Sequence, residues 1–122
     1  MILADTSVWA DHLRSGNRRL ARLLEEGRIA AHPFIVGELA CGNLRERARI
    51  LGLLERLPGV PVATHAEALE LVESRRLAAR GLGWVDVHLL ASALLGTASL
   101  WSLDRPLAAA ARQLGCALAA DQ

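Results

Sequence analysis

The sequence of 122 residues has room for one domain, over residues 1–122, and not for two. Apolar residues make up 52% and charged residues 22%, which excludes a disordered chain and allows a sizeable core. A net charge of +1 excludes a global field for nucleic acid or an anionic membrane, and because all 14 basic residues are arginines, any mechanism that needs a lysine amine is excluded.

Short apolar runs alternate along the chain with segments of helical periodicity. Strands are predicted at residues 2–4, 28–31, 60–63, 99–101 and 116–118. Helices are predicted at residues 7–14, 18–26, 33–41, 45–57, 66–80, 86–95 and 105–114. Several of these helices precede a glycine that can end them, and Thr64 with Glu67 fits the capping box that begins a helix.

This alternation predicts an α/β fold of three α/β/α layers, in which helices cover both faces of a central parallel sheet of about five strands. In the strand order 3-2-1-4-5, the first and fourth strands are neighbours. Open sheets of this kind bind ligands beyond the carboxyl ends of their strands. Polar residues at those ends are therefore the candidates for function.

The two cysteines, Cys41 and Cys116, have neither the spacing of a zinc site nor that of a disulfide framework. Both are predicted to be small core residues in a reducing cytosol. The amino-terminal residues lack the basic run of a signal peptide, and the longest apolar stretch, 85–101, is too short to span a bilayer comfortably. We expect a cytoplasmic protein with no membrane partner.

Carboxylates follow two of the predicted strands and begin one of the predicted helices. Asp5 directly follows the first strand, and Asp104 follows the fourth. Each could equally cap the next helix, and Thr6 could replace Asp5 in that role. Asp86 lies near the start of its helix, so capping is again an alternative.

A fourth carboxylate, Glu38, shares a predicted helical face with Ile35, Leu39 and Gly42, which predicts that it points inward. A buried glutamate needs a partner, because removing its charge from water is costly. A buried ion pair with an arginine is therefore the alternative to a functional role.

The four carboxylates can converge on one point beyond the first and fourth strands. Carboxylates held so close repel one another, and hard divalent cations supply the missing positive charge. Carboxylate oxygens with several retained waters are the ligands that Mg²⁺ or Mn²⁺ prefers. The sequence therefore predicts a site for one of these ions at this edge of the sheet.

Four segments carry a resemblance to PIN-domain ribonucleases, and specifically to the VapC toxins of VapBC toxin–antitoxin pairs. These segments are Met1–Trp9, Ile35–Ala40, Gly83–Ala93 and Leu100–Asp104. Their order and spacing, and the length of the chain, agree with the family, so the resemblance covers essentially the whole sequence.

The resemblance implies that one acidic quartet binds the metal and catalyses: Asp5, Glu38, Asp86 and Asp104. Asp5 and Asp86 lead that set as metal contacts. It further implies hydrolysis of RNA phosphodiester bonds by an activated water, with Mg²⁺ or Mn²⁺ as cofactor and with 5′-phosphate and 3′-hydroxyl ends as products. Thr6 and Ser102 match supporting hydroxyl positions beside two of the acids, where an oxygen can orient a carboxylate or a water.

His88 is a further supporting candidate, two residues after Asp86, although a lone histidine in such a helix is more often structural. Pro106 and Leu107 depart from many relatives, which puts only substrate contacts in doubt. The family also implies a VapB-type antitoxin and a homodimer that assembles into a larger toxin–antitoxin complex. Arginines at 14–22, 45–49 and 75–80 would contact RNA phosphates or else form solvated helix faces.

Other classes of protein fit less well. A receiver-like module needs a lysine after its fifth strand, and a phosphatase of the haloacid-dehalogenase type needs a second aspartate where Ser7 stands. A dinucleotide-binding fold needs a glycine-rich turn that the chain lacks. The remaining alternative is a catalytically silent PIN-like module that binds RNA or protein.

Overall fold

A sheet of three parallel strands lies at the centre of the computed structural model, which describes residues 1–121. Residue 122, the last of the predicted domain, lies outside the described residues. The strands are β1 (Ile2–Ala4), β2 (Ile29–Ala30) and β3 (Ser99–Trp101), in the order β2-β1-β3. Because β1 pairs with both neighbours, its carboxyl end and that of β3 emerge side by side, with Ala4 opposite Trp101.

The sheet has three strands where about five are predicted. Residues 60–63 form no strand, and the chain beside β2 makes only an isolated bridge between Ala31 and Gly59. Prolines at 58 and 61 lack the N–H that a ladder requires, so this edge cannot extend. The last predicted strand is likewise reduced to a bridge between Leu100 and Ala117. These bridges nevertheless lie on the two outer edges that the order 3-2-1-4-5 assigns to them.

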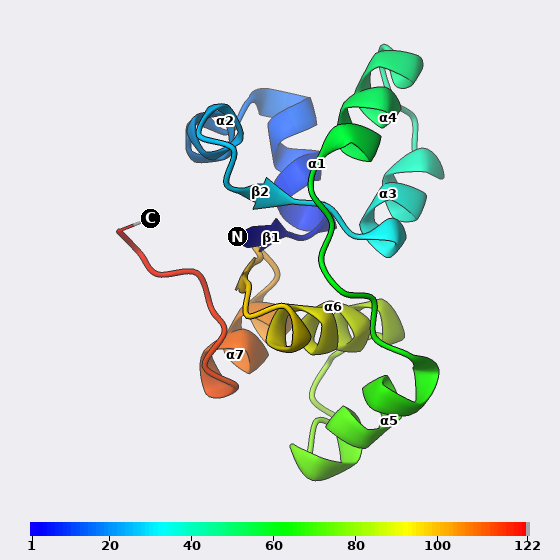
Figure 1. Ribbon diagram of the computed structural model, residues 1–122, viewed down its shortest axis with the longest axis vertical. Coiled ribbons are helices and arrows are strands. Elements are labelled where there is room, and N and C mark those ends of the chain that lie inside the picture. Colours follow the sequence, from blue (N-terminus) through cyan, green and yellow to red (C-terminus); the bar gives the residue numbers. More distant parts are fainter. Residues whose placement is uncertain (122) are drawn as a thin grey trace.

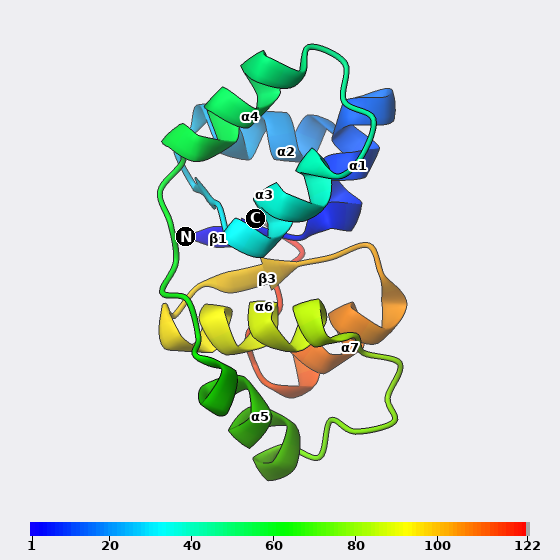
Figure 2. The same cartoon turned by 90° about the vertical axis from the view of Figure 1, so that its right-hand side faces the viewer.

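Seven helices flank this sheet within the described part of the chain. They are α1 (Thr6–Ser15), α2 (Arg18–Glu25), α3 (Pro33–Ala40), α4 (Arg47–Arg56), α5 (His65–Ser74), α6 (Trp84–Leu95) and α7 (Arg105–Gln113). Figures 1 and 2 show α1 to α4 toward the β2 edge of the sheet and α5 to α7 toward the β3 edge. Among residues 1–121, no helix is both long enough and apolar enough to cross a membrane.

The start of α5 confirms one local prediction and its end contradicts another. Thr64 accepts a hydrogen bond from the Glu67 backbone N–H, and the Glu67 carboxylate accepts one from the Thr64 N–H, which completes the capping box. The helix ends at Ser74 rather than at residue 80, because Arg76 and Ala79 adopt left-handed backbone conformations with φ of 54° and 60°.

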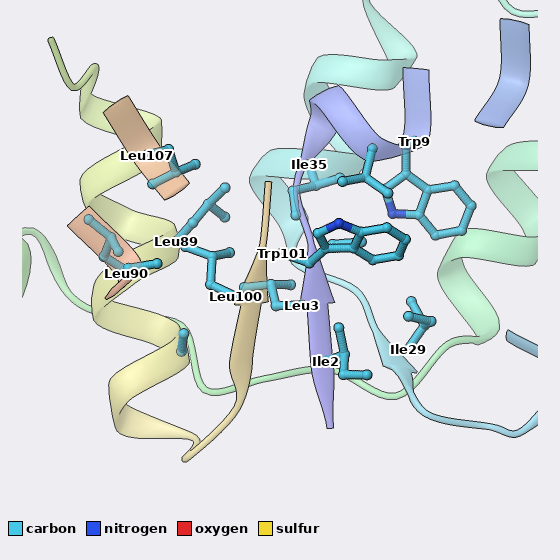
Figure 3. Close-up of a cluster of buried hydrophobic side chains, with 14 of the residues drawn as sticks. Ile2, Leu3, Trp9, Ile29, Ile35, Leu89, Leu90, Leu100, Trp101 and Leu107 are labelled. Carbon is cyan, nitrogen blue, oxygen red and sulfur yellow. The ribbon is translucent and has the colours of Figure 1, made fainter. Parts of the chain in front are cut away.

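The core fills the space between the sheet and the helices on either side of it. Figure 3 shows Leu89 and Leu90 of α6 with Leu107 of α7 beside β3, and Trp9 with Ile35 beyond β1. Each of these side chains is at most 1% exposed, so they fix α6 and α7 against the strand ends. Burying these side chains positions α6 and α7, which carry Asp86 and Asp104 at their N-terminal ends.

The cysteine prediction holds for one residue of the two. Cys116 is buried beside β3, but Cys41 is exposed just after α3, and both thiols are free. Cys41 is exposed because α3 ends at Ala40, where the chain turns away from the core toward α4.

Candidate carboxylate site

Three helices begin at the carboxyl edge of the sheet, and each has an acid at its N-cap or in its first turn. Asp5 accepts a hydrogen bond from the Val8 N–H at 3.3 Å, and Asp104 accepts one from the Leu107 N–H at 3.1 Å, so both cap their helices. Asp86 lies inside the first turn of α6 and accepts from the Gly83 N–H at 2.9 Å. Capping and convergence are thus compatible, since the positive ends of three helices lie where the carboxylates gather.

Two serine hydroxyls hold the Asp5 carboxylate. The Ser7 Oγ donates to Asp5 Oδ1, and the Ser102 Oγ donates to Oδ2 at 2.6 Å. Ser7 also accepts from the Leu103 N–H at 2.9 Å, and Ser102 accepts from the Asp104 N–H at 3.0 Å. The segments after β1 and β3 are therefore joined by hydroxyl groups, and the orientation of Asp5 is fixed.

Ser7 is a site residue that the sequence analysis missed. Ser7 lies two residues after Asp5, and at this spacing its Oγ can donate a hydrogen bond back to the Asp5 carboxylate. That spacing is visible in the sequence, but the contact of Ser7 with Leu103 depends on the pairing of β1 with β3.

The prediction that Glu38 points into the core is wrong. Its side chain is exposed, while Ile35 and Leu39 on the same helix are buried. Glu38 lies at the edge of a groove between α1, α3 and α4, which leaves this side of α3 open to solvent. Its partner is a hydroxyl and not an arginine, because the Thr6 Oγ1 donates to Glu38 Oε1 at 2.6 Å. Thr6, the residue that follows Asp5, therefore links Glu38 to the start of α1.

The charges of the other three acids affect the pKa of Asp86, which indicates that the four acids form one site. Its burial raises the pKa of Asp86, the hydrogen bond from Gly83 opposes that rise, and the negative charges of Asp104, Asp5 and Glu38 add to it. None of the four ion pairs among residues 1–121 involves any of these carboxylates. The site therefore carries concentrated negative charge without a cationic side chain bound to it.

This donor set fits a hard divalent cation. All four side chains offer carboxylate oxygens, and the mutual repulsion that raises the pKa of Asp86 is what a cation would relieve. In the described residues, no group of three or more His, Cys, Asp or Glu side chains is already arranged to hold a metal ion. Mg²⁺ commonly keeps several waters and takes only one or two carboxylates, so a fully preformed cage is not required.

His88 lies on a different side of α6 from Asp86, because two helix positions differ by about 200°. Its ring packs at right angles to Trp84, with centroids 4.8 Å apart, and lies equally close to Phe34. Burial lowers the pKa of His88, and the charge of His65 adds to that effect. These contacts favour the structural alternative for His88.

The fold and this site define a class of α/β proteins in which acidic side chains gather at the carboxyl edge of a parallel sheet. The family model described as PIN domain matches residues 2–113, and the chain belongs to the PIN-domain family. Two curated relatives from two strains of Mycobacterium tuberculosis, both named Ribonuclease VapC32, are each 50% identical to the chain over 120 residues. The match covers 98% of this chain and 97% of each relative, which confirms the resemblance to VapC-type PIN ribonucleases.

Proposed function

We propose that this protein is an endoribonuclease toxin of the VapC type, which hydrolyses RNA phosphodiester bonds with a Mg²⁺ or Mn²⁺ ion held by Asp5, Glu38, Asp86 and Asp104. One observation carries the proposal: Asp5, Asp86 and Asp104 lie at the starts of three helices, at the edge of the sheet where open α/β folds bind ligands. The negative charges of Asp5, Glu38 and Asp104 also contribute to the raised pKa of Asp86. The full-length similarity to a ribonuclease supports the reaction type. We infer that the protein acts in the cytoplasm, where its RNA substrate would be present.

The residues of the carboxylate site have different proposed roles. Asp5 and Asp86 lie on separate segments and would both hold the cation, while hydroxyls of Ser7 and Ser102 keep Asp5 in one orientation. Asp104 and Glu38 supply further oxygens at the same edge. When bound, the cation would supply Lewis acidity at the scissile phosphate.

The test of this function is RNA cleavage by the wild-type chain and by Asp86→Asn. The substitution keeps an oxygen that can accept the Gly83 N–H bond and removes one charge from the site. We expect loss of Mn²⁺-dependent cleavage of bulk transfer and ribosomal RNA with an unchanged circular dichroism spectrum. The matched control, Glu55→Gln, removes an exposed charge on α4 and should cleave normally. Wild-type rates in Asp86→Asn would reject the site.

The silent-module alternative predicts a different result from the same protein. A PIN-like scaffold without a metal site should melt at the same temperature with and without Mn²⁺, whereas a ligand that binds only the folded state raises the melting temperature. A rise in the wild type that is lost in Asp86→Asn favours the enzyme. No shift in the wild type favours the scaffold.

A VapB-type antitoxin is the protein partner that this family implies, and we infer that it docks in the groove beside Glu38. The groove has a volume of about 820 Å³ and lies between α1, α3 and α4, with Trp9, Leu39 and Ile50 among its lining residues. An arginine of the partner could pair bidentately with Glu38 at its edge. Phe34 does not line this groove and packs against His88 instead.

A homodimer is the second assembly that we propose. Trp84, the first residue of α6, is 39% exposed. Its ring packs against the rings of His65 and His88. An exposed tryptophan held by neighbouring rings is typical of an interface, because it buries a large area at little entropic cost. Two copies joined there would assemble with antitoxins into a larger complex.

A further inference from the structure

Two arginines from distant parts of the chain lie at the same end of the molecule as the carboxylate site. Arg80 belongs to the loop that connects α5 to α6, and Arg105 is the first residue of α7. Both side chains are exposed, and within residues 1–121 neither forms a hydrogen bond or an ion pair. Their guanidinium groups are therefore available to an external anion.

The packing of Gly81 against Pro106 brings these two segments together. A Cβ added to Gly81 would lie 3.3 Å from Cγ of Pro106, so the Gly81 backbone packs closely against the Pro106 ring, one residue beyond Arg80 and one beyond Arg105. Gly81 has φ of +78°, which a side chain would strain. Figure 2 shows the loop before α6 reaching the first turn of α7.

The loop that carries Arg80 is anchored at both ends. Leu77 is 2% exposed and its N–H donates to the Val72 carbonyl at 3.0 Å, while Leu82 packs against the core. The backbone of Arg80 is therefore fixed between two apolar contacts. A fixed arginine loses less conformational entropy on binding than one on a free loop.

These two arginines can offset the electrostatic repulsion between the RNA phosphates and the carboxylate site. RNA carries one negative charge per phosphate, and the site holds four carboxylates, none of which forms an ion pair within residues 1–121. The net charge of only +1 gives no global attraction to overcome that repulsion. Attraction must come from cationic groups beside the acids, and Arg105 directly follows Asp104 in the chain.

We propose that Arg80 and Arg105 form a clamp that holds the RNA backbone at phosphates flanking the scissile bond. This inference rests on the proposed function and names the positioning residues for its substrate. Guanidinium groups bind phosphate bidentately, so each arginine can hold one phosphate and set the register of the strand over the carboxylates. Neither side chain takes part in the hydrolytic step.

The test compares Arg80→Ala/Arg105→Ala with the wild type, and with a control that removes two arginines elsewhere, Arg56→Ala/Arg112→Ala. Arg56 and Arg112 are exposed, make no ion pair or side-chain hydrogen bond within residues 1–121, and lie in the last turns of α4 and α7. Binding of a labelled, mixed-sequence 20-nucleotide RNA is measured in the Asp86→Asn background at several salt concentrations. Cleavage of bulk RNA is measured with each arginine pair in the otherwise wild-type chain.

The clamp predicts a rise of about tenfold in Kd and in KM, with kcat within about twofold of the wild type. The slope of log K against log salt should become shallower by about 1.4, because two phosphate contacts are lost on a single strand. Arg80→Lys/Arg105→Lys should recover part of the affinity, which a packing role would not allow. An unchanged salt slope in the alanine pair, or an equal loss in the control pair, overturns the clamp.

Failure of the clamp and failure of the proposed function give different results. If the wild type cleaves RNA and the alanine pair binds and cleaves as well as it does, the clamp is wrong and the ribonuclease stands. If the wild type cleaves no RNA while the alanine pair still loses binding and salt dependence, the ribonuclease is wrong and the clamp belongs to an RNA-binding module.

Discussion

Both oxygens of Asp5 accept hydroxyl hydrogen bonds, and one of them also caps α1. Ser7 lies at the start of the same helix, and Ser102 directly follows the neighbouring strand β3. Replacing Asp5 would therefore remove a helix cap and the hydrogen bond from Ser102, together with the proposed metal contact. Asp86 has a single backbone donor, so its substitution separates chemistry from folding more cleanly.

The first prediction concerns the charge of Asp86 in the absence of metal. Because burial and the neighbouring carboxylates raise the pKa of Asp86, its ionised form destabilises the folded chain. Asp86→Asn should therefore unfold at a higher urea concentration than the wild type at pH 7 in EDTA, with an unchanged m-value. In saturating Mn²⁺ the order should reverse, because only the wild type gains from the ion. Equal midpoints in EDTA would contradict the assigned repulsion.

A second prediction concerns His32, which is fully buried at the start of α3. Its Nδ1 accepts from the Phe34 N–H at 3.0 Å, and its Nε2 lies 3.1 Å from the Ser92 Oγ, which suits a neutral ring with the proton on Nε2. Burial, with the charge of His88 second, lowers the pKa of His32 from 6.5 to about 4.

Stability should therefore fall as the pH drops from 6.5 to 4, because the unfolded chain takes up a proton that the folded chain refuses. The cost to the free energy of unfolding is about 3 kcal/mol over that range. His32→Asn keeps a capping oxygen but cannot titrate, so urea unfolding at pH 6.5 and pH 4 should show this extra loss in the wild type alone. Parallel losses in both proteins would contradict it.

The sequence places three of the four acids well, because Asp5, Asp86 and Asp104 follow directly from strand ends and helix starts. It misplaces Glu38, since helical spacing cannot reveal that α4 leaves a groove along that side of α3. The role of Ser7 is also hidden, because its second partner is 96 residues away in the chain. Acids at strand ends and helix starts can be predicted from the sequence, whereas contacts that depend on tertiary packing cannot.

At the level of the elements, local signals succeed where they are self-contained. The capping box of α5 was predictable because Thr64 and Glu67 satisfy each other without any distant residue. The end of the same helix was not, because the residues from 75 to 80 keep apolar and polar periodicity while Arg76 and Ala79 turn left-handed. The lengths of the two edge strands were overestimated for a similar reason. The apolar runs at 60–63 and 116–118 do not show whether a neighbouring strand can form backbone hydrogen bonds with them.

A third prediction tests the capping box directly. Thr64→Ala removes the acceptor for the Glu67 N–H at 3.1 Å and should lower the free energy of unfolding by about 1 kcal/mol. Thr64→Ser retains the hydroxyl and is the matched control, which should lose less than half as much. Urea unfolding monitored by circular dichroism measures both. A Thr64→Ala protein as stable as the wild type would show that α5 is held by packing on α6 alone.

For the whole molecule, the fourth prediction concerns the proposed homodimer. Equilibrium sedimentation at micromolar concentration should show a dimer for the wild type and a shift toward monomer for Trp84→Ala, because the exposed indole would supply central buried area. Leu103→Ala, another exposed apolar side chain far along the sequence, is the control and should remain dimeric. A wild type that is monomeric throughout this range would rule the dimer out.

A fifth prediction separates two modes of inhibition by the antitoxin. If a partner arginine pairs with Glu38 or Asp104, it contends with the cation for the same oxygens, and inhibition should weaken as Mn²⁺ rises. A partner that covers only the groove near Trp9 would inhibit equally at every metal concentration. Inhibition constants measured across a Mn²⁺ titration distinguish the two, and a flat response excludes competition while leaving the toxin assignment intact.

The sheet order β2-β1-β3 also has a consequence during synthesis on the ribosome. The central strand is among the first residues to emerge, yet β3 begins at residue 99, so β1 waits with one side unpaired while most of the chain is made. Ser102 and Asp104 arrive later still. A nascent chain that stalls before residue 99 therefore carries Asp5, Glu38 and Asp86 but lacks the strand β3 beside them. The nuclease site is not assembled until β3 has joined the sheet.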